Sequence, residues 1–506
     1  MTQVIAGIVL LCFILVTIAV GVVSSRKART VEGFLLGGRT VGPWLSAFSY
    51  GTTYFSAVIF VGYAGMFGWT IGLAGIWIGV ANALLGCLLA WFVLARPARR
   101  MTHALNARTI PEFFAARYNC SIMKRFAAVI IFIFLVPYAA SVYKGLGVLF
   151  SSIFTSASPT LCIVIVAALT GIYLVLGGYV ATTLNDLIQG FIMVVGLIAM
   201  LLILAGRPEV GGISGATLNL SAIDGNLVDL FGGANIKQLI PNILLTSFGV
   251  WGMPQMVHKY YAVKDENSIR IATVISTVFA LIIGGGAYFT GALGRLFVPA
   301  AESGAPDLAA GYDGVVPAML MSALGNGVLP NIILGVILLL LLSASMSTLS
   351  SVVISSSSAI SIDLIHEINP NVKQGTQLML MRWLCVLFII LSFIFATMNI
   401  SFIVNLMSFS WGVVAGSFIG PFLWGLYGKW VTKAGAWAGL LAGVVVVGGL
   451  LIYFTSSMGF AAAKSLAPQM GVAAMAVSVI AVPLVSLVTK KFDGAHTDKV
   501  FGGELR

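Results

Sequence analysis

The chain has little charge for its length. Of its 506 residues only 8% are charged, whereas 59% are hydrophobic. An ordinary soluble domain is about 25% charged. Uncharged runs recur along the whole chain, each near the ~20 residues that a helix needs to cross a bilayer. The shortage of charge excludes a soluble globular domain and predicts an all-α polytopic membrane protein.

Motifs of enzymes and ATP-driven pumps are also missing. The four histidines have no partner at metal-ligand spacing, and no Ser-His-Asp set or G-x-x-x-x-G-K-[ST] loop occurs. The five cysteines are scattered, without a disulfide framework, and are interpreted as small apolar packing residues. We therefore expect that the chain is not an enzyme.

About thirteen apolar segments are long enough to span a membrane. They are roughly 3–24, 43–67, 72–95, 126–150, 159–178, 186–206, 238–258, 271–297, 328–362, 379–398, 402–427, 433–455 and 468–489. Residues 4–23 lack a small-residue cleavage site, so we expect a retained helix there. The sequence predicts a single transmembrane domain over 1–490 and a short, polar, mobile cytoplasmic tail over 491–506.

The net charge of +11 follows a pattern along the chain. Most basic residues fall in alternate loops, on one side of the expected membrane. Those on the other side are Arg207, Lys237, Arg295 and Lys464. The positive-inside rule then predicts a multi-pass cell-membrane protein with its N-terminus outside and its C-terminus in the cytoplasm. The excess of positive charge is explained by the orientation of the chain in the membrane and does not indicate binding to nucleic acid. We therefore expect the protein to lie in a lipid bilayer, with no nucleic-acid partner and no obligate protein partner.

Two of the expected spans contain helix-breaking sequence. In the second span (43–67), Gly51-Thr52-Thr53-Tyr54-Phe55-Ser56 interrupts an apolar run, and in the seventh (238–258), Gly249, Gly252 and Pro254 lie close together. Broken backbone survives in a membrane only where protein or a cavity receives it. The breaks are five spans apart, and an odd offset reverses direction. They predict inverted repeats over approximately 43–206 and 238–427 with a binding site at the paired breaks; the alternative is simple packing kinks.

The ninth expected span turns from apolar to hydroxyl-rich. Residues 343–361 hold ten serines and Thr348. Ala344, Ser347, Thr348 and Ser351 follow i, i+3, i+4, i+7 and share one helix face, with Ser350 beside them. Hydroxyls and carbonyls are the oxygen ligands of hard cations. This face is a candidate ion site; the alternative for the serines, preferred for Ser355 to Ser358, is hydrogen bonding to carbonyls of their own helix.

The chain resembles the sodium/solute symporter family, which includes bacterial proline and pantothenate symporters and sodium/glucose cotransporters. The resemblance rests on four stretches in the family's order, Phe34-Leu-Leu-Gly-Gly-Arg-Thr-Val-Gly-Pro-Trp44, Arg108-Thr-Ile-Pro-Glu-Phe-Phe-Ala-Ala-Arg-Tyr118, Gly177-Gly-Tyr-Val-Ala181 through Asn185-Asp186, and Ala344-Ser-Met-Ser-Thr-Leu-Ser350. It implies a leucine-transporter-type 5+5 inverted repeat, with the second and seventh helices broken, and sodium as the coupling ion.

The resemblance also implies ion sites. The main sodium site would use carbonyls of Thr52, Phe55 and Ala344 and the hydroxyls of Ser347 and Thr348. A second sodium site, present in some members, would match Asp186, Ser347, Ser350 and Ser351. The alternative for Asp186 is capping of a helix that begins at 186, where a carboxylate suits the positive end.

The resemblance places the solute between the second, fourth, seventh and eleventh spans. The candidate substrate-binding residues are Thr53, Tyr54, Ser56, Tyr138, Ser141, Lys144, Thr246, Val250, Trp251 and Pro254. Proline-type members carry an acidic residue at the place of Tyr54 and a tyrosine at that of Val250, which weighs against proline itself.

Lys144 is a lysine inside an expected span, and intramembrane charge usually marks function. It could pair with a substrate carboxylate, reach the outer surface about 9 Å away, or replace a cation in the second site. It lies about 120° around its helix from Tyr138, so it could line the outer vestibule.

We therefore expect a sodium-coupled symporter that imports a small organic solute by alternating access: a monocarboxylate, an amino acid or a pantothenate-like acid. Two alternatives stay open. One is a proton-coupled symporter of the same fold, with Asp186 or Lys144 titrating. The other is a solute sensor, although sensors of this family usually carry a cytosolic signalling domain that this tail is too short to hold.

Overall fold

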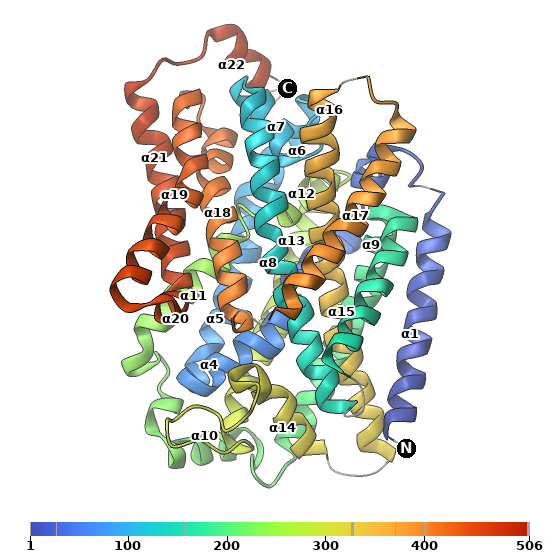
Figure 1. The fold of residues 1–506 in the computed structure, drawn as a ribbon, viewed down its shortest axis with the longest axis vertical. Helices are drawn as coiled ribbons and strands as arrows, with labels where there is room; N and C mark the ends of the chain where they lie inside the picture. The colour runs from blue at the N-terminus through green and yellow to red at the C-terminus, as the bar shows by residue number, and fades with distance from the viewer. Residues whose placement is uncertain are drawn as a thin grey trace.

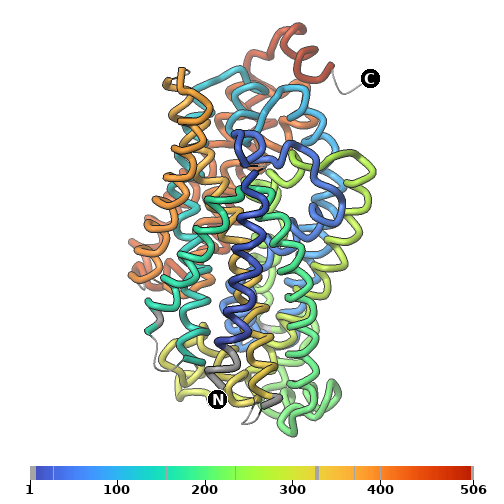
Figure 2. Tube along the Cα trace, turned by 90° about the vertical axis from the view of Figure 1, so that its right-hand side faces the viewer, coloured from blue at the N-terminus to red at the C-terminus, as the bar shows by residue number. Residues whose placement is uncertain are grey.

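The fold is a tall bundle of helices whose long members run along one common axis (Figures 1 and 2). A computed structural model describes residues 2–26, 28–154, 158–324, 328–369, 371–398 and 401–502. The two chain ends lie at opposite ends of the bundle (Figure 1), and we call these the N-terminal face and the C-terminal face. Within the described ranges, extended backbone pairs only at isolated bridges, Val41 with Val263 and Ala300 with Pro306.

The described helices account for nearly the whole chain. They are α1 (Thr2–Ser24), α2 (Val31–Leu36), α3 (Pro43–Tyr54), α4 (Ala64–Ile71), α5 (Ile76–Ala81), α6 (Arg96–Ala104), α7 (Ile110–Tyr118), α8 (Ser121–Ile153), α9 (Pro159–Ala205), α10 (Gly212–Ile223), α11 (Ile236–Gly249), α12 (Pro254–Ala262), α13 (Glu266–Leu293), α14 (Val315–Leu324), α15 (Val328–Ser358), α16 (His366–Ile368), α17 (Gln374–Thr397), α18 (Ile403–Tyr427), α19 (Lys433–Met458), α20 (Phe460–Ser465), α21 (Ala467–Val488) and α22 (Gly494–Phe501). The π-helical stretches are η2 (Val58–Tyr63), η4 (Asn82–Leu89), η5 (Trp91–Ala95) and η10 (Ala359–Ile365).

Large apolar side chains cover the outside of the bundle. Val23, Leu202 and Trp383 are 76%, 70% and 65% exposed, which water would penalise and lipid tails accept. In the described part of the chain, ten helical stretches are long and apolar enough to cross a membrane. Two of them, Val58–Ala104 and Thr160–Ala205, each take in parts of two expected spans, and the expected span 238–258 is divided between α11 and α12. The chain is therefore an all-α multi-pass membrane protein.

A glycine turn divides α9. A straight helix of its 47 residues would be about 70 Å long, roughly twice the ~30 Å hydrocarbon core. Gly178 interrupts it with φ 55° and ψ −148°, a conformation that favours glycine. The second half of α9 is helical from 179 onward, so the expected helix start at 186 is wrong. Asp186 lies inside the helix and does not cap it.

Both predicted breaks are present. α3 ends at Tyr54 because Phe55 is extended, with φ −106° and ψ 110°, and π-helical η2 follows from Val58. α11 ends at Gly249, and α12 begins at Pro254, where the missing N–H of proline costs nothing. The two breaks leave backbone carbonyls without helical partners in the middle of the bundle.

The expectation of a mobile polar tail is wrong for its first part. Residues 494–501 form α22, whose Val500 and Phe501 are buried. The guanidinium of Arg117 lies 4.9 Å from the centre of the Phe501 ring, a favourable cation–π distance. Apolar and cation–π contacts therefore dock the tail on α7, whereas residues 503–506 lie outside the described part.

Candidate functional site

The end of α3 meets the hydroxyl-rich stretch of α15. The Thr348 hydroxyl lies 3.0 Å from the Thr53 carbonyl oxygen, 3.1 Å from that of Ala344 and 3.4 Å from that of Thr52. One hydroxyl hydrogen cannot satisfy three carbonyls, so lone pairs of several oxygens converge on one buried point. Such a set suits a hard monovalent or divalent cation.

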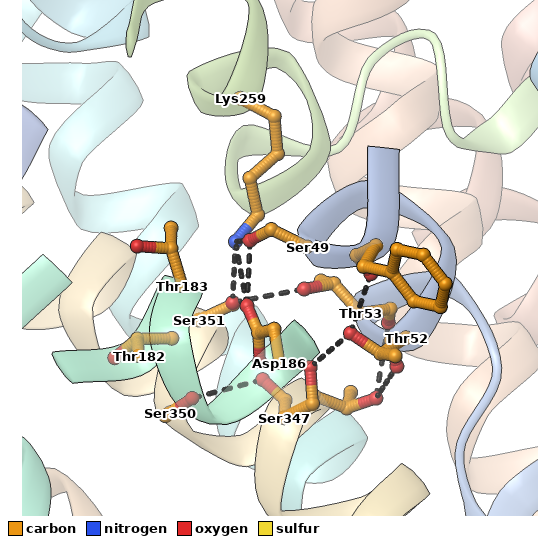
Figure 3. Close-up of polar contacts among 12 residues, drawn as sticks. Ser49, Thr52, Thr53, Thr182, Thr183, Asp186, Lys259, Ser347, Ser350 and Ser351 are labelled. Atoms are coloured by element: carbon orange, nitrogen blue, oxygen red, sulfur yellow. Dashed lines mark hydrogen bonds and ion pairs between the residues drawn. The ribbon is translucent and has the colours of Figure 1, made fainter. Parts of the chain in front are cut away.

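Four of the five residues predicted for the main sodium site lie together here. The Ser347 hydroxyl donates to Thr52 Oγ1 at 2.7 Å (Figure 3), which adds side-chain oxygens beside the carbonyls of Thr52 and Ala344. All four residues are fully buried. The fifth, Phe55, follows directly; its amide donates to Gly51 at 3.2 Å and its ring stacks on Tyr54. No hydrogen bond joins the Phe55 carbonyl to the described part of α15.

Two of the residues predicted for the second sodium site, Asp186 and Ser351, contact a charge that sequence reasoning missed. Lys259, on α12, extends its amine between α3, α9 and α15 (Figure 3). Its Nζ donates to Ser49 Oγ at 2.7 Å and to Ser351 Oγ at 2.9 Å, and lies 3.8 Å from Asp186 Oδ2. Ser49 in turn donates to Asp186 Oδ2 at 2.6 Å. We call Ser49, Asp186, Lys259 and Ser351 the lysine cluster.

The hydroxyls of the other two predicted second-site residues, Ser347 and Ser350, donate to other acceptors. Ser350 donates to the carbonyl of Ser347 in its own helix at 2.9 Å, and Ser347 donates to Thr52. Of the deeper serines, Ser357 and Ser358 also bond within their helix, as expected. For Ser355 and Ser356 the expectation is wrong, because their buried hydroxyls have no hydrogen-bond partner among the described residues. Helix-internal bonding therefore describes Ser350, Ser357 and Ser358, but not Ser351.

The central substrate candidates form an aromatic and hydroxyl group between the breaks. Tyr54 donates to the Thr246 carbonyl at 2.7 Å, and its ring lies 6.4 Å from that of Trp411 on α18. Tyr138 meets the same Trp411 edge-on at 5.7 Å. The Thr246 hydroxyl donates to Asn82 Oδ1 at 2.8 Å. Side chains from α3, η4, α8, α11 and α18 thus form one buried wall, which we call the solute wall.

The remaining substrate candidates are placed less uniformly. Thr53 pairs with Ser351 at 3.0 Å, and Ser56 lies in the α3 break. Ser141 donates within α8 to the Tyr138 carbonyl, and Val250 is buried between α11 and α12. Trp251 donates outward to the Leu85 carbonyl, and Pro254 begins α12. All of these candidates except Ser141 therefore lie in or directly beside one of the two breaks.

Lys144 is held near the N-terminal face, away from the central group. Its Nζ lies 3.2 Å from Asp313 Oδ2 and donates to the Ser401 carbonyl at 2.7 Å. Burial raises the pKa of the Asp313 carboxyl above its usual value, against the opposing effect of the Lys144 ammonium. Lys144 also lines a cavity of about 580 Å³ with Ser151, Ser152 and Thr160. This pair ties α8 to the loop before α14.

Replacing Asp313 by asparagine should open this tie. The Lys144 charge would lose its carboxylate partner, so the protein should open toward the N-terminal side more often. We expect a cysteine placed at Ser56 to be labelled roughly tenfold faster, which corresponds to a change of about 1.4 kcal/mol in the free energy of opening. Labelling would be measured from the N-terminal side in a background without the five native cysteines. Glu302→Gln, an exposed change in the same loop, is the control. Equal rates in both variants would refute a gating role for the pair.

Ion pairs tie the C-terminal face as well. The Lys124 amine lies 3.1 Å from Glu367 and 4.0 Å from both Glu112 and Asp363. Thr109 donates to Asp363 at 2.8 Å. These contacts join α7, α8 and η10. With the Lys144 pair at the opposite face, both ends of the central region are bridged by charged groups.

Sequence reasoning missed Lys259, Ser49, Asn82 and Trp411. Lys259 directly follows the expected seventh span (238–258), so the sequence places it in a loop on the basic side, yet α12 carries it into the bundle. The signal was present: the residues after it, Tyr260-Tyr261-Ala262-Val263, are apolar or aromatic, and a lysine in such a run is costly unless paired. Ser49, Asn82 and Trp411 carry no comparable local signal.

Comparison with known proteins decides the family. The model of the sodium:solute symporter family matches residues 34–443. The chain belongs to this family. Its members are transporters, so the protein is a transporter and not an enzyme, as expected. The breaks, the α15 hydroxyl face and the lysine cluster all lie inside the matched range.

Among relatives in this family are two proline transporters of Bacillus subtilis (strain 168). The osmoregulated proline transporter OpuE is 28% identical over 483 residues, which cover 95% of this chain and 94% of the relative. The high-affinity proline transporter PutP is 26% identical, with 85% and 88% covered. The similarity therefore extends over nearly the full length of both proteins.

Solved structures agree on the fold. A Na⁺-coupled sialic acid symporter in a substrate-bound outward-open state superposes with a TM-score of 0.72 at 18% identity, over 96% of this chain and 98% of the other. The nucleobase-cation-symport transporter Mhp1 in a closed conformation gives 0.52 at 14% identity, over 92% and 97%. Both neighbours have the leucine-transporter-type fold, so the predicted fold type is confirmed.

Proposed function

We propose that this chain is a sodium-coupled symporter that imports a small organic solute by alternating access. The observation that carries the proposal is the meeting of the Thr348 hydroxyl with the carbonyls of Thr52, Thr53 and Ala344 at the α3 break. These buried oxygens come from two helices that are almost 300 residues apart in sequence. A sodium ion bound among them would hold α3 against α15.

Coupling follows from the position of the break. Tyr54 lies between the ion-site residues Thr52 and Thr53 and the solute wall of Thr246 and Trp411. Ordering of the break by sodium would set the position of Tyr54, and a bound solute would favour the same arrangement. The two ligands then raise each other's affinity, and this coupling is reciprocal.

The proposed solute is a monocarboxylate, an amino acid or a pantothenate-like acid. Proline and sialic acid, the solutes named for the relatives and for one structural neighbour, are both carboxylic acids. The buried wall here presents hydroxyl, amide and aromatic groups from Tyr54, Thr246, Asn82, Tyr138 and Trp411. Tyr54 and Val250 replace the residues of proline-type members, so we propose a solute other than proline.

The membrane arrangement is proposed from charge and the paired breaks. Thirteen spans, inverted repeats over approximately 43–206 and 238–427, an external N-terminus and a cytoplasmic C-terminus complete the proposal. In Figure 1 helices α6, α7, α16 and α22 lie at the C-terminal face, and α6 and α7 carry the basic residues Arg96, Arg99, Arg100 and Arg117. The positive-inside rule assigns that face to the cytoplasm.

The proposal is tested by thermal unfolding of the detergent-purified protein with a panel of carboxylates, amino acids and sugars, in sodium and in potassium. A ligand of the folded state raises its stability by RT ln(1 + [L]/Kd), about 2.7 kcal/mol at 100 Kd. We expect sodium alone to raise the unfolding midpoint, and one class of carboxylate to raise it further only in sodium. Equal shifts in both salts would refute sodium coupling and favour the proton-coupled alternative.

A further inference from the structure

The lysine cluster holds a positive charge where the family resemblance placed a second sodium ion. Lys259 is 1% exposed and Asp186 is fully buried, so neither charge is stabilised by bulk water. Their separation of 3.8 Å and their shared contact with Ser49 make each the main counter-charge of the other. The centre of the Tyr179 ring lies 5.1 Å from the amine and adds a favourable face for a cation.

The hydrogen bonds around the amine are consistent in direction. An ammonium group only donates, so Ser49 and Ser351 accept from Lys259. Ser49 then passes its own hydrogen to Asp186 Oδ2, and the hydroxyl of Ser351 lies 3.0 Å from that of Thr53. The amine thereby takes the place that a metal cation would take among a carboxylate and two hydroxyls.

We propose that the Lys259 ammonium is the resident cation of this second site, so that only one sodium ion, in the main site, is bound. The inference rests on the proposed function, which it deepens by fixing the number of coupling ions. A second sodium ion among the same oxygens would lie within a few ångströms of the ammonium. Like charges at that distance inside a protein repel strongly, so amine and ion exclude each other.

The tethered charge also links the two broken helices. Lys259 belongs to α12, which follows the second break, and its acceptors Ser49 and Ser351 belong to α3 and α15. A chain of contacts runs from Lys259 through Ser351 and Thr53 to Thr348 at the main ion site. The lysine therefore fastens α12 to the same pair of helices that the proposed sodium ion joins.

The oxygens around the amine could hold sodium if the amine were removed. Asp186 Oδ1 is buried without a hydrogen-bond partner among the described residues, and Asp186 Oδ2, Ser49 Oγ and Ser351 Oγ surround the Lys259 amine. These are hard oxygen donors of the kind that bind alkali and alkaline-earth cations. Lys259→Met should therefore convert the cluster into a second sodium site.

The test measures binding of radioactive sodium to the purified full-length protein at equilibrium. We expect one sodium ion per wild-type molecule, two per Lys259→Met molecule, and one again in Asp186→Asn/Lys259→Met, which lacks both charges. The control is Lys264→Met, an exposed change on the same segment, which should bind one. Two ions in the wild type, or one in Lys259→Met, would overturn the inference while leaving sodium coupling intact.

A second readout reports only on the folded protein, so it still applies if part of the Lys259→Met preparation is misfolded. Thermal unfolding of Lys259→Met over a range of sodium concentrations should give about twice the wild-type midpoint shift per tenfold rise in sodium, because two ions bind the folded state. An unchanged shift would overturn the inference. Absence of any saturable sodium binding in the wild type is a different result: it would overturn the proposed function and, with it, this inference.

Discussion

Asp186→Asn should lower the free energy of unfolding by about 3–5 kcal/mol, the range found when one partner of a buried ion pair is removed. The variant leaves the Lys259 ammonium without its carboxylate at a position that is 1% exposed. Unfolding would be followed by tryptophan fluorescence in mixed micelles with increasing denaturing detergent. The loss should be present in potassium as in sodium, because the pair is internal.

A double variant separates the ion pair from other effects of the substitution. Asp186→Asn/Lys259→Met removes both charges, and we expect it to recover most of the stability lost in the single variant. The exposed change Glu209→Gln should leave stability within about 0.5 kcal/mol of the wild type. If Asp186→Asn were as stable as Glu209→Gln, the pairing of Lys259 with Asp186 would be wrong.

Thr348→Val should reduce the affinity for sodium roughly 30-fold with little change in fold. The substitution preserves side-chain shape and removes the oxygen that lies within 3.4 Å of three carbonyls. A hydrogen bond or ligand contact to a charged group contributes about 2 kcal/mol, which corresponds to that factor. The measurement is the sodium concentration that gives half-maximal thermal stabilisation.

Thr170→Val is the matched control for this variant. Thr170 is fully buried in α9, but its hydroxyl has no hydrogen-bond partner among the described residues. The same exchange of atoms at this position should leave the sodium dependence unchanged. A Thr348→Val protein that retained wild-type sodium dependence would remove Thr348 from the proposed ion site.

The sequence was most informative where local chemistry conflicts with lipid. Gly249 and Pro254 interrupt an apolar run, and Thr52 and Phe55 lie in a polar interruption; both breaks are present. Thr348 and Ser347 share a helix face by spacing alone, and the structure turns that face toward Thr52. These predictions succeeded because helix periodicity and helix-breaking residues act over only a few residues.

Features that depend on distant contacts were not predictable in this way. The expected spans 159–178 and 186–206 imply a loop between them, whereas the structure has a single turn at Gly178 and helix from 179 onward. Asp186, which belongs to a buried ion pair, therefore looks like a helix cap in the sequence. In the sequence Lys259 resembles a charged residue of a loop, whereas in the structure α12 places it beside Asp186. The docking of Phe501 on Arg117 joins residues almost 400 apart, which no short pattern contains.

Lys144 shows a third case, in which the sequence left the outcome open. Its place in a span marked it as functional, and its angle from Tyr138 indicated the vestibule. The structure pairs it with Asp313 near the N-terminal face, so a part in gating is favoured over a direct contact with solute in the central group.

Uptake into proteoliposomes tests the central claim most directly. Purified protein would be supplied with a solute found in the thermal screen, under an inward gradient of either sodium or protons, with the membrane potential held at zero. The account predicts accumulation above the external concentration only with the sodium gradient, and its loss in Thr348→Val at low sodium. Equal accumulation from a proton gradient in the absence of sodium would contradict it.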